Sequence, residues 1–341
     1  MTYPDADVRR PGGGQAEASP GRVRESVRRS IEVRDLARTF ADLQAVDRLT
    51  FDVAEGELFG IVGPDGAGKT TTLRMLAGIL PPTAGFASVM DVNVGTDPEA
   101  AKPHLAYMAQ RFGLYEDLTV EENLHFYADL YRVPKAARPE RLERLYAFSR
   151  LGEFKDRLAG KLSGGMKQKL ALSCSLIHHP QVLLLDEPTF GVDPISRREL
   201  WLILHEMVAE GVTVVVSTSY LDEAERCDRV LLLNEGRTLA LDRPQVLQGT
   251  VLEGTLVAIR TDRPRTARNL LRETAGVEGA ALFGEYVHAL LHPETDLEAV
   301  RQALTGAGIR VLEAEEIEPS LEDVFIRLVH LDEERRSATH A

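Results

Sequence analysis

The sequence predicts an α/β protein built on a largely parallel sheet, followed by a small α+β domain. Three observations lead to this prediction. Short continuous apolar runs, typical of buried strands, alternate with segments of helical periodicity. A glycine-rich loop follows the first such run and opens a helix. Beyond about residue 244 the pattern changes to short strands and helices that lack motifs of this kind.

Composition sets the limits for this fold. The chain has 341 residues, 44% of them hydrophobic, which is enough to fill a substantial core. Its formal net charge of −13 argues against nucleic acid as the main partner, because phosphate neutralisation needs clustered cations. The only two cysteines, Cys174 and Cys227, lie in expected helices and suit buried positions in a reducing compartment.

Two kinds of segment are missing from the sequence. The first ten residues lack the apolar stretch of a secretory signal, and no window approaches the roughly 18 apolar residues of a membrane span. Work at a membrane would therefore require another subunit. Residues 1–30 are rich in glycine, proline and arginine, which predicts a disordered arm.

The first predicted domain covers residues 31–243. Alternating patterns at 31–33 and 49–53 predict half-buried antiparallel strands. Buried strands are expected at 58–62, 182–185 and 212–217, with helices at 69–80, 194–210 and 221–227. A helical insertion is expected between Gln110 and Gly165, at 120–150 with a break at Pro134 and at 164–178.

The second predicted domain covers residues 244–331. Its strands are expected at 255–260, 286–291 and 309–312, and its helices at 264–274, 296–305 and 320–330. The charged residues 332–341 are expected to fray as a tail.

The glycine-rich loop is the strongest functional signal. It fits the pattern G-x-x-x-x-G-K-[ST] between a buried strand and a helix, with the residues Gly63, Pro64, Asp65, Gly66, Ala67, Gly68, Lys69 and Thr70, and Thr71 follows. Backbone N–H groups of such a loop curl around the β-phosphate of ATP, while Lys69 reaches the β- and γ-phosphates and the Thr70 hydroxyl binds Mg²⁺. Asp65 is expected to point away from the phosphates, because its carboxylate would repel them.

Two acids follow the buried run at 182–185. A strand there delivers Asp186 and Glu187 to the edge of the sheet where the phosphates lie. We expect Asp186 to hold Mg²⁺ through water and Glu187 to polarise the attacking water.

A third motif, Ser163-Gly164-Gly165, opens the helix at 164–178. Such a helix start offers a second phosphate pocket, although an ordinary N-cap at Ser163 explains the motif by itself equally well. Its position shortly before the strand that carries Asp186 favours the phosphate interpretation.

In this combination and order, from Ile31 to about Asp242, the motifs resemble those of ABC transporter ATP-binding subunits. The resemblance implies that Phe40 stacks on adenine and that Gln110 senses Mg²⁺ and links the site to a membrane subunit. It also implies a head-to-tail dimer, in which each ATP lies between one phosphate loop and the Ser163–Gly165 motif of the other subunit. The loop at 190–194 would cross that interface.

Three segments, at 110–119, 194–201 and 220–227, resemble the ATPases of YbhF-like, type-2 multidrug exporters. The ending at 318–325 is similar to the C-terminal domain of daunorubicin-resistance exporter ATPases. These resemblances imply a separate membrane-spanning permease, a second ATP-binding domain as homodimer or heterodimer partner, and a cytoplasmic position on the inner face of the cell membrane.

One residue departs from the family pattern. Where members usually have Ser-Thr-His, with a histidine that contacts the γ-phosphate, this chain has Ser217-Thr218-Ser219. A serine hydroxyl is too short to replace an imidazole as a proton-sharing partner. Our hypothesis is slow hydrolysis at this site, or a function borrowed from the partner.

Two other functions remain open. Ser219 favours a regulatory ATP-binding module with negligible turnover, but Glu187 argues against it. A soluble ABC protein acting on ribosomes or DNA usually has paired domains or a long coiled coil, which this chain lacks.

Overall fold

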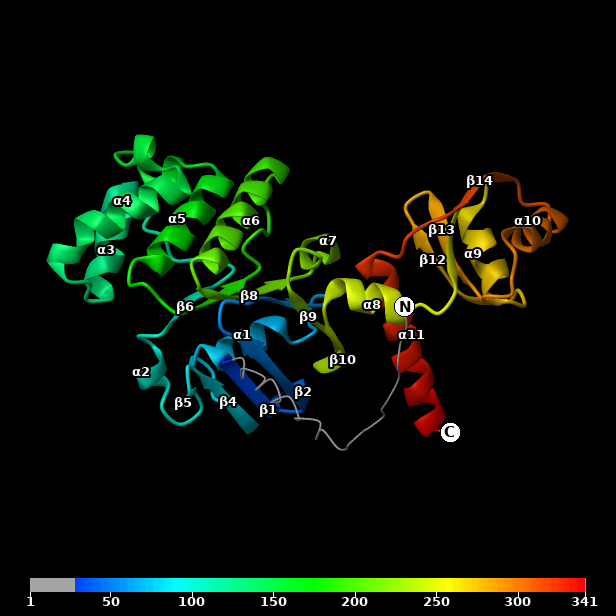
Figure 1. Ribbon diagram of the computed structural model, residues 1–341, viewed down its shortest axis with the longest axis horizontal. Coiled ribbons are helices and arrows are strands. Elements are labelled where there is room, and N and C mark those ends of the chain that lie inside the picture. The colour runs from blue at the N-terminus through cyan, green and yellow to red at the C-terminus, as the bar shows by residue number, and fades with distance from the viewer. Residues whose placement is uncertain (1–27, 341) are drawn as a thin grey trace, which may run out of the picture.

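The computed structural model describes residues 28–340 and contains the predicted α/β core with three further parts around it (Figure 1). Residues 1–27 of the expected N-terminal arm lie outside the described residues. The predicted end of that arm at residue 30 is wrong, because strand β1 (Arg29–Phe40) already begins within it. Pairing with a neighbouring strand explains this early start, since Arg29 lies opposite Ala54.

The central sheet has six strands in the order β10-β9-β3-β8-β7-β6. Strands β3 (Leu58–Val62), β9 (Arg229–Asn234), β8 (Thr213–Thr218), β7 (Val182–Asp186) and β6 (Leu105–Met108) are parallel. Only the edge strand β10 (Arg237–Asp242) is antiparallel, as the second strand of a hairpin with β9. The parallel strands therefore all end at one edge of the sheet.

Both faces of the central sheet are buried. Leu58 and Val62 belong to a core that also holds Trp201 of helix α6 (Pro194–Ala209). Phe59 and Ile61 point into a second core together with helix α1 (Lys69–Leu76). Because side chains alternate along a strand, a continuous apolar run is what burial on both faces requires.

An antiparallel sheet in the order β2-β1-β4-β5 covers the α1 side of the molecule (Figure 1). Its other strands are β2 (Leu43–Ala54), β4 (Ala84–Val89) and β5 (Val92–Asn93), and helix α2 (Pro98–Ala101) follows.

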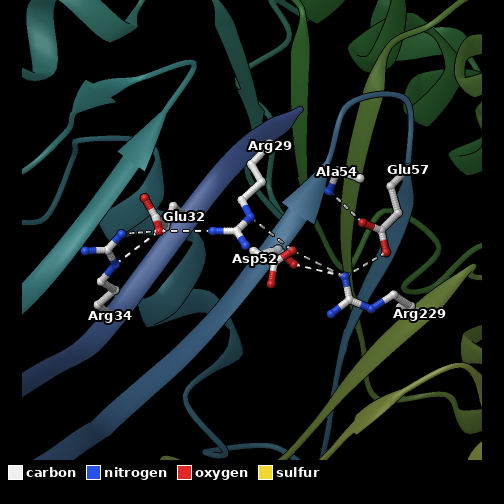
Figure 2. A network of polar contacts seen from close by, with 7 residues as sticks. All are labelled: Arg29, Glu32, Arg34, Asp52, Ala54, Glu57 and Arg229. Atoms are coloured by element: carbon white, nitrogen blue, oxygen red, sulfur yellow. Dashed lines mark hydrogen bonds and ion pairs between the residues drawn. The ribbon is translucent and has the colours of Figure 1, made fainter. Parts of the chain in front are cut away.

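A polar network joins this antiparallel sheet to the central sheet (Figure 2). Arg229 at the start of β9 pairs with Glu57, at 3.4 Å between Nη1 and Oε1, and also with Asp52 of β2. Glu57 accepts a hydrogen bond from the Ala54 N–H at 2.7 Å. Figure 2 also shows Arg29 between Glu32 and Asp52, so the network continues along β1.

The expected helical insertion is present and has its own core. It contains α3 (Val120–Leu130), α4 (Arg138–Ser149) and α5 (Gly164–Leu176). Thr119 begins α3 with a capping box to Glu122, and the chain breaks around Pro134 before α4 starts.

The C-terminal part is an antiparallel sheet in the order β12-β13-β11-β14, packed against two helices. The strands are β11 (Thr255–Thr261), β12 (Val277–Phe283), β13 (Tyr286–Leu291) and β14 (Val311–Glu316). The helices are α9 (Pro264–Arg272) and α10 (Leu297–Gly306), while α8 (Pro244–Thr250) connects this part to β10. The domain boundary at 243/244 stays a prediction.

The prediction of a frayed tail at 332–341 is wrong, because helix α11 extends from Leu321 to His340. This helix contacts α7 (Leu221–Ala224), α8 and β10, and Arg336 near its end pairs with Glu235 at 2.5 Å. Contacts of this kind supply the stability that an isolated charged helix end lacks.

Other element boundaries also differ. Helix α1 ends at Leu76 because Gly78 adopts a positive φ of 66°. Helix α7 ends at Ala224, so Cys227 lies outside a helix, although both cysteines are free and buried as expected. Strand β14 begins at Val311, two residues later than predicted.

Candidate functional site

The glycine-rich loop links β3 to α1 at the edge where the parallel strands end. A Cβ atom at Gly63 would lie 2.2 Å from the Leu233 carbonyl oxygen. Gly68 has a φ of 99°, and a Cβ atom there would lie 2.6 Å from the Ala45 carbonyl oxygen. Only glycine fits at these two positions, where β9 and β2 approach the loop.

Lys69, the first residue of α1, is buried beneath this loop. Its Nζ donates to the carbonyl oxygens of Gly63 at 2.7 Å and Pro64 at 3.1 Å. It also forms an ion pair with Glu187, at 3.1 Å from Oε1. The ammonium group is therefore held inside the curl of the loop, where an anion would meet it.

Asp186, the last residue of β7, accepts three hydrogen bonds at this edge. Its Oδ1 accepts hydrogen bonds from Thr70 Oγ1 at 2.9 Å and Ser217 Oγ at 2.8 Å. Its Oδ2 accepts one from the Tyr107 hydroxyl at 3.1 Å. A carboxylate and a hydroxyl side by side are oxygen ligands, which suit Mg²⁺. These residues therefore fit the cation that the loop implies.

Glu187 follows directly and has an unusual backbone, with a φ of 47°. Its N–H lies 3.1 Å from Ser217 Oγ, which fixes this turn to the end of β8. Its Oε1 accepts a hydrogen bond from Ser219 Oγ at 3.3 Å as well as the ion pair from Lys69. A strained residue of this kind is typical of a functional site.

Comparisons with known proteins show which family the chain resembles. The family profile described as ABC transporter matches residues 46–190, and that of the ATP-binding protein DrrA1-3-like C-terminal domain matches residues 252–329. The Nod factor export ATP-binding protein I of Rhizobium sp. (strain N33) is 37% identical over 90% of this chain and 99% of its own length.

The chain belongs to the ABC transporter ATP-binding proteins.

Further relatives support the same family of ATPases. The probable multidrug ABC transporter ATP-binding protein YbhF of Escherichia coli (strain K12) is 46% identical over 84% of this chain, which spans half the length of YbhF. A solved ATP-binding subunit of an ABC transporter is 32% identical, with a TM-score of 0.59, over 64% of this chain and 92% of that one. The cbiO1 protein of Clostridium perfringens gives a TM-score of 0.60 at 25% identity, over 65% and 92%.

In this ABC ATP-binding protein, the Ser163 motif is not joined to the chain's own phosphate loop. Ser163 caps α5 by accepting a hydrogen bond from the Met166 N–H at 3.3 Å, as its N-cap interpretation predicts. Ser163 and Gly164 are exposed, whereas Gly165 is buried. Across residues 28–340, no hydrogen bond or ion pair connects these three residues to the loop at 63–70.

The structure also locates the other residues that the sequence assigned to the site. Phe40, the last residue of β1, is 41% exposed and has the Arg38 guanidinium 4.6 Å from its ring centre. Gln110 is exposed two residues after β6, at the same edge as Asp186. Asp65 is exposed, and Thr71 is half-buried.

A buried carboxylate behind the site was not found from the sequence. Glu223 of α7, only 1% exposed, accepts hydrogen bonds from Thr189 at 2.8 Å and Thr218 at 2.9 Å, and it pairs with Arg197 at 3.3 Å. It thus ties together the loop after Glu187, the residue before Ser219 and helix α6. The segment 220–227 resembles that of YbhF-like exporter ATPases, but nothing in it marks Glu223 for this role.

The length and apolar character of the helices bear on whether the chain crosses a membrane. Among the residues that the structure describes, no helix is both long and apolar enough to cross a bilayer.

Proposed function

We propose that this chain is the Mg·ATP-hydrolysing subunit of a type-2 ABC exporter that drives transport through a separate membrane permease. The observation that carries the proposal is the set of Lys69, Thr70, Asp186 and Glu187 at one sheet edge. The names of the relatives, a probable multidrug transporter and a Nod factor exporter, support export as the direction. The chain would work in the cytoplasm, on the inner face of the cell membrane.

The chemistry follows from the positions of these side chains. Loop N–H groups and Lys69 would bind the phosphates of ATP. Lys69 would then give up its ion pair with Glu187 and pair with the phosphates instead. Thr70 and Asp186 would hold Mg²⁺, whose charge neutralises the transferred phosphoryl group when it is bound. Glu187, released from Lys69, would orient and polarise the attacking water.

A second ATP-binding domain would complete this site. Ser163 and Gly164 are exposed and bonded to nothing in their own phosphate loop, so they are free to face the ATP of another subunit. Phe190 begins the loop that would cross between the subunits and Ile195 follows it, and their exposed fractions are 55% and 75%. Either a homodimer or a heterodimer satisfies this arrangement.

The pace of hydrolysis depends on Ser219. Its hydroxyl reaches Glu187 at 3.3 Å, and Ser219 is half-buried where family members place an imidazole. A hydroxyl at this distance from Glu187 cannot also share a proton with the γ-phosphate as an imidazole does. We therefore propose slow turnover at this site, or assistance from the partner subunit.

Steady-state ATPase assays of the wild type and Ser219→His test this proposal. The expected result is faster turnover in Ser219→His with little change in the KM for ATP. Equal turnover of both proteins, at a rate normal for the family, would show that Ser219 does not limit hydrolysis. Co-purification with the membrane permease, followed by ATPase assays with candidate compounds, tests the exporter assignment itself.

The second candidate function is a regulatory ATP-binding module with negligible turnover. The Lys69–Glu187 ion pair favours it, because Lys69 bound to Glu187 does not bind phosphate and Glu187 bound to Lys69 does not polarise water. Measurable hydrolysis that depends on Glu187 would exclude this candidate.

A further inference from the structure

Tyr107 of β6 lies next to the proposed nucleotide site, but none of the motifs assigns it a role. Tyr107 lies opposite Leu184 in the parallel pairing of β6 with β7. Asp186 lies two residues beyond Leu184, so Tyr107 and Asp186 share one face of the sheet. The Tyr107 hydroxyl reaches Asp186 Oδ2 at 3.1 Å, whereas the other two partners of this carboxylate both bind Oδ1.

The Tyr107 hydroxyl keeps its proton at neutral pH and so acts as the donor to this carboxylate. Burial raises the pKa of Tyr107 to about 12, and the negative charge of Asp186 adds to this rise, while a hydrogen bond from Arg74 of α1 opposes it. Asp186 itself is only 2% exposed, so solvent cannot readily replace a lost partner.

These donors can stay in place when the site is filled. A hydroxyl has one hydrogen to donate and two lone pairs, so Thr70 can donate to Oδ1 while its oxygen binds a cation. Thr70 and Ser217 would then hold Oδ1, and Tyr107 would hold Oδ2. With donors on both oxygens, the plane of the carboxylate stays fixed.

We propose that Tyr107 is a positioning residue that orients the Asp186 carboxylate and thereby sets the affinity of the site for Mg²⁺. This inference rests on the Mg·ATP binding proposed above. Groups that hydrogen-bond a metal-binding carboxylate orient it, and their loss typically weakens metal binding by about 10–100-fold. Tyr107 should therefore govern the Mg²⁺ dependence of nucleotide binding and leave binding without metal unchanged.

The test uses the full chain as wild type and as Tyr107→Phe, which removes one hydroxyl. Binding of a fluorescent ATP analogue is measured against Mg²⁺ concentration and again in EDTA. For Tyr107→Phe we expect the Mg²⁺ concentration at half-saturation to rise about 10-fold, with the affinity in EDTA unchanged. With Mn²⁺ in place of Mg²⁺, an electron paramagnetic resonance titration should give the same shift without relying on the fluorescent nucleotide.

Tyr286→Phe is the matched control, because the Tyr286 hydroxyl donates to Glu313 at the same distance of 3.1 Å, but in the C-terminal sheet. It should bind Mg²⁺ and nucleotide as the wild type does. An unchanged Mg²⁺ midpoint in Tyr107→Phe, or an equal loss of affinity in EDTA, would overturn the inference. If the wild type binds nucleotide equally well with and without Mg²⁺, the proposed function is contradicted, and the role of Tyr107 with it.

Discussion

The central sheet and the C-terminal sheet place their polar side chains in different ways. At the edge of the central sheet, Tyr107, Asp186 and Ser217 come from three neighbouring strands and meet the first residues of α1. In the C-terminal sheet, His288 pairs with Asp323 at 2.7 Å and Tyr286 with Glu313 at 3.1 Å, which satisfies each group locally. The first arrangement gathers polar groups from several elements around one carboxylate at the proposed nucleotide site, while the second fastens one element to another.

The two sheets are nevertheless joined by an apolar core. Leu321 and Val324 of α11 and Leu256 and Leu290 of the C-terminal sheet belong to the same buried cluster as Trp201 of α6. Substitutions in the two regions are therefore expected to have different effects. Changes at the edge of the central sheet should abolish chemistry and spare stability, and changes around α11 should do the reverse.

The largest expected effect is that of Lys69→Met. This change removes the buried ammonium group that lies inside the phosphate loop, so ATP turnover should fall by at least about 100-fold, as for other preorganised electrostatic groups. A steady-state phosphate-release assay measures this loss. Lys102→Met, which removes an exposed lysine paired with Glu99, should turn over as the wild type does. Comparable losses in both variants would show that the loop lysine has no special role.

A smaller effect is expected from Leu321→Ala at the start of α11. Leu321 is fully buried in the shared cluster, so its truncation should cost about 2–5 kcal/mol of stability. Urea unfolding followed by circular dichroism measures this cost, while ATPase activity at low denaturant should persist. Leu312→Ala removes a leucine that is 53% exposed on β14 and serves as the control. An equal cost for both would contradict the joining role of α11.

The smallest effect concerns the acid stability of the C-terminal part. Burial alone would raise the pKa of Asp323, but hydrogen bonds from His288 and Ser320 outweigh it and lower the pKa. A lowered folded-state pKa stabilises the protein above the unfolded value of about 3.9, and this stability is lost as the pH falls through the folded value.

The stability of the wild type should therefore fall below about pH 4, and Asp323→Asn should lose part of this dependence. Melting curves between pH 7 and pH 3 measure it. Glu322→Gln, at the exposed neighbouring position, should retain the dependence of the wild type. Identical acid limbs in the wild type and Asp323→Asn would show that this carboxyl is not linked to folding.

Residues marked by a local motif could be predicted from the sequence, and residues whose roles depend on strand pairing could not. Lys69 and Asp186 were predictable because a loop of fixed spacing and an apolar strand ending in acids each mark their place locally. Tyr107 and Glu223 were not, since their roles depend on which strands become neighbours and in what register. Strand β9 carries four apolar residues and could have been recognised, whereas β6 is too short to stand out.

The same reasoning explains the error at the C-terminus. The charged residues after His330 look like a tail, yet they continue α11, and Arg336 among them pairs with Glu235 between β9 and β10. Local sequence signals report propensity, whereas this helix depends on packing against a distant part of the chain.

The account is tested most directly by comparing the wild type with Glu187→Gln in two assays, ATP turnover and equilibrium ATP binding. Glu187→Gln keeps the shape of the side chain and removes the charge that would polarise water. We predict that the wild type hydrolyses ATP measurably and that Glu187→Gln binds ATP but turns over at least about 100-fold more slowly. Equal turnover in the two proteins, at either a normal or a negligible rate, would contradict the assignment of Glu187 and of the chain as an ATP-driven motor.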